Sequence, residues 1–159
     1  MSDDQSVTPE QRLAAVGITL PPAPSPAASY VPWVRSADLI FTAGQIPVLD
    51  GVPTATGRPG AEVTLEEGQA AARQCALNVL AQLRVAAGEL SAVKRLVKIT
   101  VFVASDTDFD QQHLVANGAS DLLGQVFGAE VGAHARSAVG VAVLPLNVPV
   151  EVEAIAELR

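Results

Sequence analysis

The chain has 159 residues, 49% of them hydrophobic and 17% charged, which suits one globular domain and excludes a disordered chain. Its 17 acidic residues outnumber its 10 basic residues, and the net charge of −7 disfavours a protein that grips nucleic-acid phosphates. A single cysteine, Cys75, excludes an intramolecular disulfide, and the lack of a long apolar run argues against a membrane span. These properties predict a cytoplasmic protein that acts on a small molecule.

The first 27 residues differ from the rest, and we predict an N-terminal extension at 1–27 followed by the main domain at 28–159. Thr8 can cap a short helix that starts at Pro9, with Gln11 completing a capping box. The proline-rich residues 20–26 cannot continue a helix or pair well in a sheet. We therefore expect them to form an extended connector along the surface.

The spacing of apolar residues predicts the remaining elements in chain order: two short strands, a loop, a long helix, a buried strand, a second helix and two further strands. We expect these elements at 31–35, 39–43, 50–63, 64–87, 96–103, 108–127, 135–144 and 148–157, respectively. The long helix has the clearest signals, a Thr64–Glu67 capping box at its start and Gly88 after its end.

This order lacks a strict alternation of strands and helices. It predicts an α+β fold in which two helices pack on one face of a mixed sheet. The predicted strands carry few charged residues, so the other face of the sheet needs a cover. Self-association is the simplest way to provide one.

Common catalytic and metal-binding motifs are absent, and we predict neither a metal nor a cofactor. Residues 106–110 resemble the start of a calcium loop, but the glycine and the final glutamate of such a loop are missing. His113 and His134 have no ligand-rich neighbourhood in the sequence. Cys75 falls on or beside the apolar stripe of the long helix, which favours a core residue over a nucleophile.

The candidate chemistry lies near the C-terminus. Arg136 opens a strand of small and apolar residues, where a guanidinium must reach solvent or meet an anion such as a carboxylate. Glu151 and Glu153 alternate with apolar residues, so they share one face of the last strand. Two hypotheses follow: Arg136 forms a structural salt bridge with one of these glutamates across neighbouring strands, or it anchors a carboxylate ligand.

The tail, with Ala-Arg-Ser-Ala-Val at 135–139, Leu-Pro at 144–145 and Val-Glu-Val-Glu-Ala-Ile-Ala at 150–156, resembles the signature of the YjgF/YER057c/UK114 (RidA) family. Residues 39–47 are similar to the first hairpin of that family, and residues 97–103 to its central strand. The resemblance implies a chorismate-mutase-like fold and a homotrimer with clefts between subunits. For the deaminases of the family it implies hydrolysis of enamine or imine intermediates, such as 2-aminoacrylate, to 2-keto acids and ammonia.

Carried over by position, the resemblance implies that Arg136 holds the substrate carboxylate and that Glu151 positions or activates the attacking water. It also implies substrate-binding roles for Tyr30, Gly44, Asn117 and Ala138. No cofactor is required for this chemistry, because the imine carbon is already electrophilic.

Three features depart from the common family pattern and indicate a longer subfamily with the Ala-Arg-Ser-Ala-Val-Gly motif. His134 replaces a common proline, Ala138 stands where deaminating members often have cysteine, and the 110–118 segment is longer than in short members. The leading hypothesis is a deaminase of the RidA type. The alternative is a non-catalytic protein that binds a small carboxylate metabolite in the same clefts. Ribonuclease activity is disfavoured, because a groove for single-stranded RNA needs basic and aromatic side chains.

Overall fold

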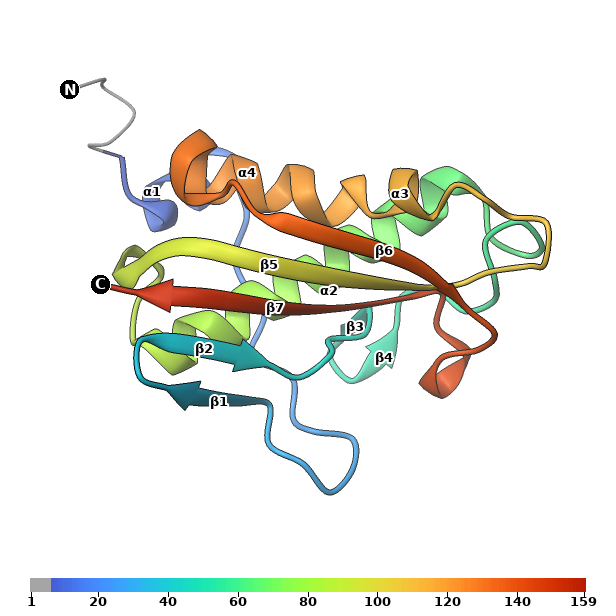
Figure 1. Cartoon of the computed structure of the whole chain (residues 1–159), viewed down its shortest axis with the longest axis horizontal. Helices are drawn as coiled ribbons and strands as arrows, with labels where there is room; N and C mark the ends of the chain where they lie inside the picture. The colour runs from blue at the N-terminus through green and yellow to red at the C-terminus, as the bar shows by residue number, and fades with distance from the viewer. Residues whose placement is uncertain (1–6) are drawn as a thin grey trace.

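A mixed sheet forms one layer of the molecule and the helices form the other (Figure 1). The computed structural model describes residues 7–159. The five strands run in the order β1-β2-β7-β5-β6, and only the β5–β6 pair is parallel. Their bounds are β1 (Trp33–Ser36), β2 (Leu39–Thr42), β5 (Val93–Ala104), β6 (Ala135–Val141) and β7 (Val150–Leu158). The predicted α+β class and mixed sheet are confirmed.

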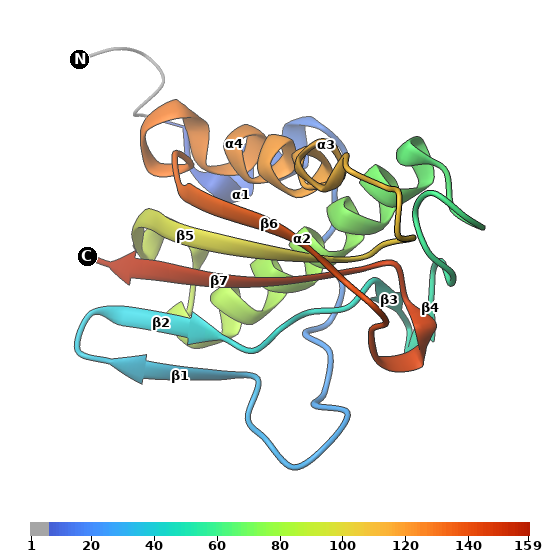
Figure 2. The same ribbon diagram turned by 45° about the vertical axis from the view of Figure 1, so that its right-hand side comes forward.

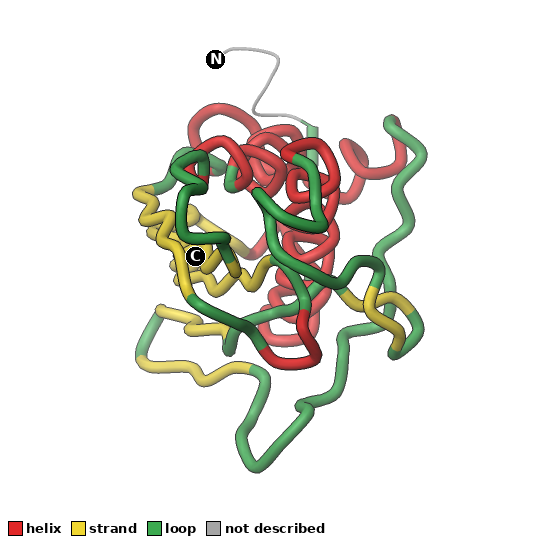
Figure 3. The backbone as a smooth tube through the Cα atoms, turned by 90° about the vertical axis from the view of Figure 1, so that its right-hand side faces the viewer, coloured by secondary structure: helices red, strands yellow, loops and turns green. Residues whose placement is uncertain are grey.

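The helices cover one face of this sheet, as the end-on view of Figure 3 and the turned view of Figure 2 show. The longest helices are α2 (Leu65–Ala87) and α4 (Asn117–Val131), and they pack on each other. The shorter helices are α1 (Pro9–Ala15), α3 (Gln112–Val115) and the 3-10 turns η2 (Leu90–Ala92) and η3 (Pro145–Asn147). Both predicted capping boxes are present, at Thr8 and at Thr64.

Several predicted boundaries are wrong; strand β5, for example, begins at Val93, three residues before the predicted start at 96. The second helix begins at Gln112 instead of 108, because residues 106–109 form a turn closed by the hydrogen bond from the Phe109 amide to the Asp106 carbonyl. Gly128, with a φ of 81°, interrupts the helical region after Phe127 as predicted, and a further short helical stretch continues to Val131. Strand β6 ends at Val141, three residues earlier than predicted.

The region predicted as a plain loop at 50–63 contains half of a small hairpin. Its strands are β3 (Val48–Leu49) and β4 (Val52–Pro53). The two residues between them, Asp50 and Gly51, both have positive φ, at 52° and 78°. An Asp-Gly pair is the usual choice for such a two-residue turn, so the signal for the hairpin was present in the sequence.

The core lies between the sheet and α2 and α4. Along β7 the burial alternates, with the odd-numbered side chains, including Glu151 and Glu153, on the face away from the helices. Leu13 and Leu20 of the predicted extension are buried in the same core. In addition, the Leu90 amide donates to the Glu10 carboxylate at 2.6 Å. The division at residue 27 and the homotrimer stay predictions.

Candidate functional site

Arg136 lies on the edge strand β6 and reaches toward α3 and α4. Its Nη1 donates to Asn117 Oδ1 at 2.9 Å and to Ser120 Oγ at 3.1 Å, and its Nη2 donates to the His113 carbonyl at 3.0 Å. All three acceptors are neutral. Within residues 7–159 no carboxylate pairs with this guanidinium, so its charge is available to an anion.

The salt-bridge hypothesis for Arg136 is wrong within one chain, because β5 separates β6 from β7. Arg136 is in register with Ile99, which pairs with Ala154, whereas Glu151 pairs with Phe102. Two strand spacings and three residues along the strand put the Cα atoms of Arg136 and Glu151 roughly 14 Å apart. The pleat also directs the two side chains to opposite faces of the sheet.

Glu151 lies against Gly44, at the point where the chain leaves β2. The Gln45 amide donates to the Val152 carbonyl at 2.7 Å, which holds the turn beside β7. A Cβ on residue 44 would collide with the Glu151 carboxylate, so glycine is required for this close approach. Burial, and then the neighbouring Glu153 carboxylate, raise the pKa of Glu151. Both effects make its carboxylate a stronger base than a glutamate in water.

A cavity of about 640 Å³ is lined by Glu151 and Gly44, together with Tyr30 from the segment before β1. The Tyr30 hydroxyl accepts a hydrogen bond from the Ala27 amide at 3.2 Å. One chain thus groups the predicted site residues in two places. Arg136 and Asn117 are together on the helix side of the sheet edge, and Tyr30, Gly44 and Glu151 share this cavity.

Ala138 and Cys75 contribute packing in the described structure. Ala138 lies two residues after Arg136 on β6, is partly buried and packs against the core. Cys75 is buried on α2, and its Sγ donates to the Val150 carbonyl at 3.5 Å. Burial, and then the Glu151 charge, raise the pKa of the thiol well above its usual range. The core position predicted for Cys75 is confirmed.

Sequence reasoning missed two side chains beside Arg136, those of Ser120 and His134. His134 Nδ1 lies 2.7 Å from the Gly132 carbonyl, which can only accept, so Nδ1 carries a proton. In the neutral imidazole Nε2 then accepts from the Ser120 hydroxyl at 2.9 Å, and that hydroxyl oxygen accepts from Arg136. The arginine and the histidine therefore share one serine. Nothing in the local pattern signals a contact between Ser120 and His134.

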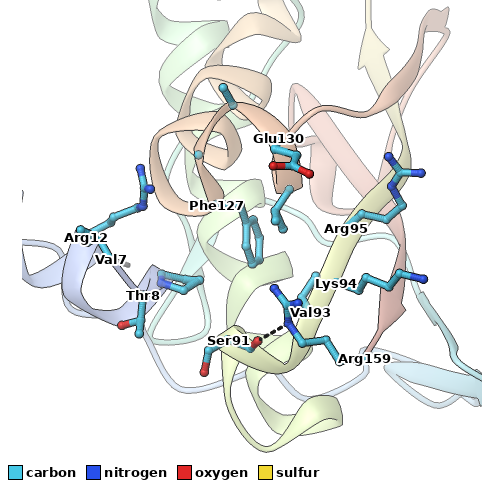
Figure 4. A pocket seen from close by; sticks show the side chains of 14 residues that line it. Val7, Thr8, Arg12, Ser91, Val93, Lys94, Arg95, Phe127, Glu130 and Arg159 are labelled. Atoms are coloured by element: carbon cyan, nitrogen blue, oxygen red, sulfur yellow. Dashed lines mark hydrogen bonds between the residues drawn. The ribbon is translucent and has the colours of Figure 1, made fainter. Parts of the chain in front are cut away.

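A second cavity of about 790 Å³ lies at the end of the molecule where α1 and the C-terminus meet (Figure 4). Its rim carries Lys94, Arg95 and Arg159, but Lys94 pairs with Glu157 at 2.8 Å and Arg159 donates to the Ser91 carbonyl at 3.2 Å. None of the predicted site residues lines it.

The described part of the chain contains no group of three or more His, Cys, Asp or Glu side chains that could hold a metal ion. Within residues 7–159, no helix combines the length and the apolar character needed to cross a bilayer.

Comparison with known proteins agrees with this fold. Residues 10–158 match the family described as "YjgF/chorismate_mutase-like, putative endoribonuclease". Protein TCP17 of Trypanosoma cruzi is 52% identical over 158 residues, which cover 97% of this chain and 99% of that protein. The 2-iminobutanoate/2-iminopropanoate deaminase of Escherichia coli K12 is 36% identical over 139 residues, 86% of this chain and 93% of the enzyme. The crystal structure of E. coli TdcF with bound serine is similar with a TM-score of 0.64 and 32% identity, covering 86% and 94% of the two chains. The chain therefore belongs to the YjgF/chorismate-mutase-like family, as the resemblance of its tail predicted.

Proposed function

We propose that this protein is a homotrimeric deaminase that hydrolyses 2-imino acids, and their enamine tautomers, to 2-keto acids and ammonia. The complete site forms between two subunits. Arg136 of one subunit faces Glu151, Gly44 and Tyr30 of the next. Asn117 stays with Arg136 as its hydrogen-bond partner, and Ala138 contributes its backbone beside it.

The reaction needs one water and no other reactant. The Arg136 guanidinium binds the substrate carboxylate, which orients the imine carbon for attack. The Glu151 carboxylate accepts a proton from the attacking water as the C–O bond forms, and the proton moves to nitrogen. The new hydroxyl group then gives up its proton, which also passes to nitrogen, the C–N bond breaks, ammonia leaves, and the carbonyl of the keto acid remains. A base with a raised pKa suits this step at neutral pH.

The observation that carries the proposal is the separation of Arg136 from Glu151. The cation makes hydrogen bonds only to neutral acceptors among the described residues, and the desolvated carboxylate lies on the opposite face of the sheet. Neither half can complete the chemistry alone, whereas a second copy can supply the missing half. The names of the E. coli deaminase and of TdcF with bound serine support an amino-acid-derived substrate.

The alternative proposal is a non-catalytic protein that uses the Arg136 half to bind a small carboxylate. It predicts ligand binding without turnover. The two proposals differ in Glu151, which catalysis requires and carboxylate binding does not. A binding protein would also tolerate Glu151→Gln without loss of its ligand.

Subunit complementation tests the proposal. Arg136→Ala and Glu151→Gln should each abolish release of keto acid from imines generated by an amino-acid oxidase. When the two variants are co-expressed at equal levels, a site between subunits should recover to about a quarter of wild-type activity, because some clefts receive both intact residues. Co-expression of Arg136→Ala with Arg136→Lys is the control and should recover nothing.

Two results would refute the proposal. A mass near one chain of 16.4 kDa in light scattering would remove the cleft between subunits. Failure of the wild-type protein to accelerate hydrolysis of any imine, while it still binds a keto acid, would leave only the binding alternative.

A further inference from the structure

The predicted extension forms one wall of the cavity that contains Glu151. Seven of the residues lining this cavity lie in the extension, at Pro21, Pro22, Ala23, Pro24, Ser25, Pro26 and Ala27. Glu151 and Gly44 line the same cavity. The cavity therefore combines a carboxylate suited to the reacting atoms with an apolar wall built from residues ahead of the main domain.

The wall is tied to the body of the protein by a buried glutamine. Gln82 of α2 is 1% exposed, and its Nε2 donates to the Pro24 carbonyl at 2.8 Å and to Gln45 Oε1 at 3.3 Å. Gln45 is the residue that pairs with Val152, next to Glu151. Leu20, 7% exposed, anchors the start of the connector in the core, and the Tyr30 hydroxyl binds the Ala27 amide near its end.

The rest of the lining offers few free polar groups to a ligand beyond Glu151. The Asn78 amide already donates to the Ile46 and Val48 carbonyls, at 2.9 and 3.0 Å. Leu146, an exposed apolar side chain held at a φ of 58°, adds to the apolar rim. Gln45 is bonded to the Ala43 carbonyl and to Gln82, so the polar side chains that remain are Ser25, the exposed Asp50 and Tyr30, whose hydroxyl can still donate. Proline rings keep the wall rigid, so little ordering entropy is lost when a ligand packs on it.

The size of the cavity indicates what it holds. A volume of about 640 Å³ is in the range of cavities that enclose ligands much larger than a three-carbon imino acid. We propose that the connector forms a side-chain subsite, and that the preferred substrates are 2-imino acids with an apolar side chain of about four carbons or more. This inference rests on the proposed function and names its substrate class.

Product binding tests the subsite at equilibrium. Pyruvate and 4-methyl-2-oxopentanoate have the same reacting end and differ by three carbons. Each buried methylene adds roughly 4-fold to affinity, so calorimetry should find the larger acid bound about 10- to 60-fold more tightly. The kcat/KM for the imine of leucine should likewise be higher than that for the imine of alanine.

A variant that fills the cavity separates the subsite from the reacting end. Ala27→Phe places a ring on the exposed connector wall and leaves its backbone hydrogen bond to Tyr30 possible. It should weaken the binding of 4-methyl-2-oxopentanoate by about 5-fold or more and change the binding of pyruvate by less than about 2-fold, because only the larger acid uses the filled space. Ala14→Phe, at an exposed alanine of α1 away from the cavity, is the control and should change the affinity for neither acid.

The outcomes distinguish this inference from the proposed function. Turnover of imines with no dependence on chain length, or with a preference for the alanine imine, overturns the subsite alone. The subsite is also overturned if Ala27→Phe weakens the binding of both acids equally, as it would if a second copy of the chain fills the cavity. Absence of turnover with every imine overturns the deaminase itself.

Discussion

Replacing Gly118 with alanine tests how α4 is placed against α2, and thereby how Asn117 and Ser120 reach Arg136. A Cβ at residue 118 would collide with the Gln69 carbonyl oxygen and lie 2.7 and 2.9 Å from the carbonyl carbon and Cα of Gln69. These are backbone atoms inside α2, so no side-chain rotation relieves the contact. Carbon atoms normally meet at about 3.5 Å or more, so the helices must separate by roughly 1 Å.

The cost follows from the packing of these two helices. Overpacking a close-packed core costs about 1–3 kcal/mol, and a backbone-to-backbone collision belongs at the upper end, near 3 kcal/mol. For a chain of this size that corresponds to a loss of about 6–12 °C in Tm. Thermal unfolding should be followed by circular dichroism at fixed protein concentration, because assembly couples to Tm.

Gly124 provides a matched control on the same helix. A Cβ there meets nothing within 4 Å, and the backbone is helical. Gly124→Ala should therefore stabilise the protein by about 0.5–1 kcal/mol through helix propensity. Equal Tm values for the two variants, or a stabilised Gly118→Ala protein, would refute the claim that contact at Gly118 sets the distance between α2 and α4.

Gly44→Ala should lower kcat/KM for imine hydrolysis by about 100-fold, because its Cβ displaces the Glu151 carboxylate, while Tm changes little since that side chain can rotate away. Near wild-type kinetics would show that the close approach is dispensable. Folding raises the pKa of Glu151 above its ordinary value of 4.5, so the ionised form lowers stability as pH rises through and above that value. Glu151→Gln should therefore raise Tm at pH 7, and the gain should shrink as pH falls through the raised pKa toward 4.5; a gain that grows in acid would contradict this sign. Cys75 should resist a thiol reagent in the native protein and react rapidly in urea, because it is buried and its pKa is raised. Prompt reaction of the native thiol would show that α2 opens readily.

Local chemistry in the sequence determined where several elements begin and which way the last strand faces. The capping boxes at Thr8 and Thr64 involve residues three positions apart, so the pattern alone predicts them. The alternation at 150–158 likewise put Glu151 and Glu153 on one face, because the pleat repeats every two residues. The 108–127 helix was misplaced at its start, which depends on a turn at 106–109, whereas Gly128 interrupts it after Phe127 as the sequence predicts.

Only the tertiary structure decided how the candidate residues are grouped. Arg136 and Glu151 are 15 positions apart in the sequence, yet the insertion of β5 between their strands and the parity of the pleat separate them. Gln82 meets the Pro24 carbonyl 58 residues away, which turns an apparent surface connector into a wall of the cavity. Periodicity reports which face of its own element a residue occupies. It does not report which elements become neighbours, because strand order and helix packing follow from burial of the whole core.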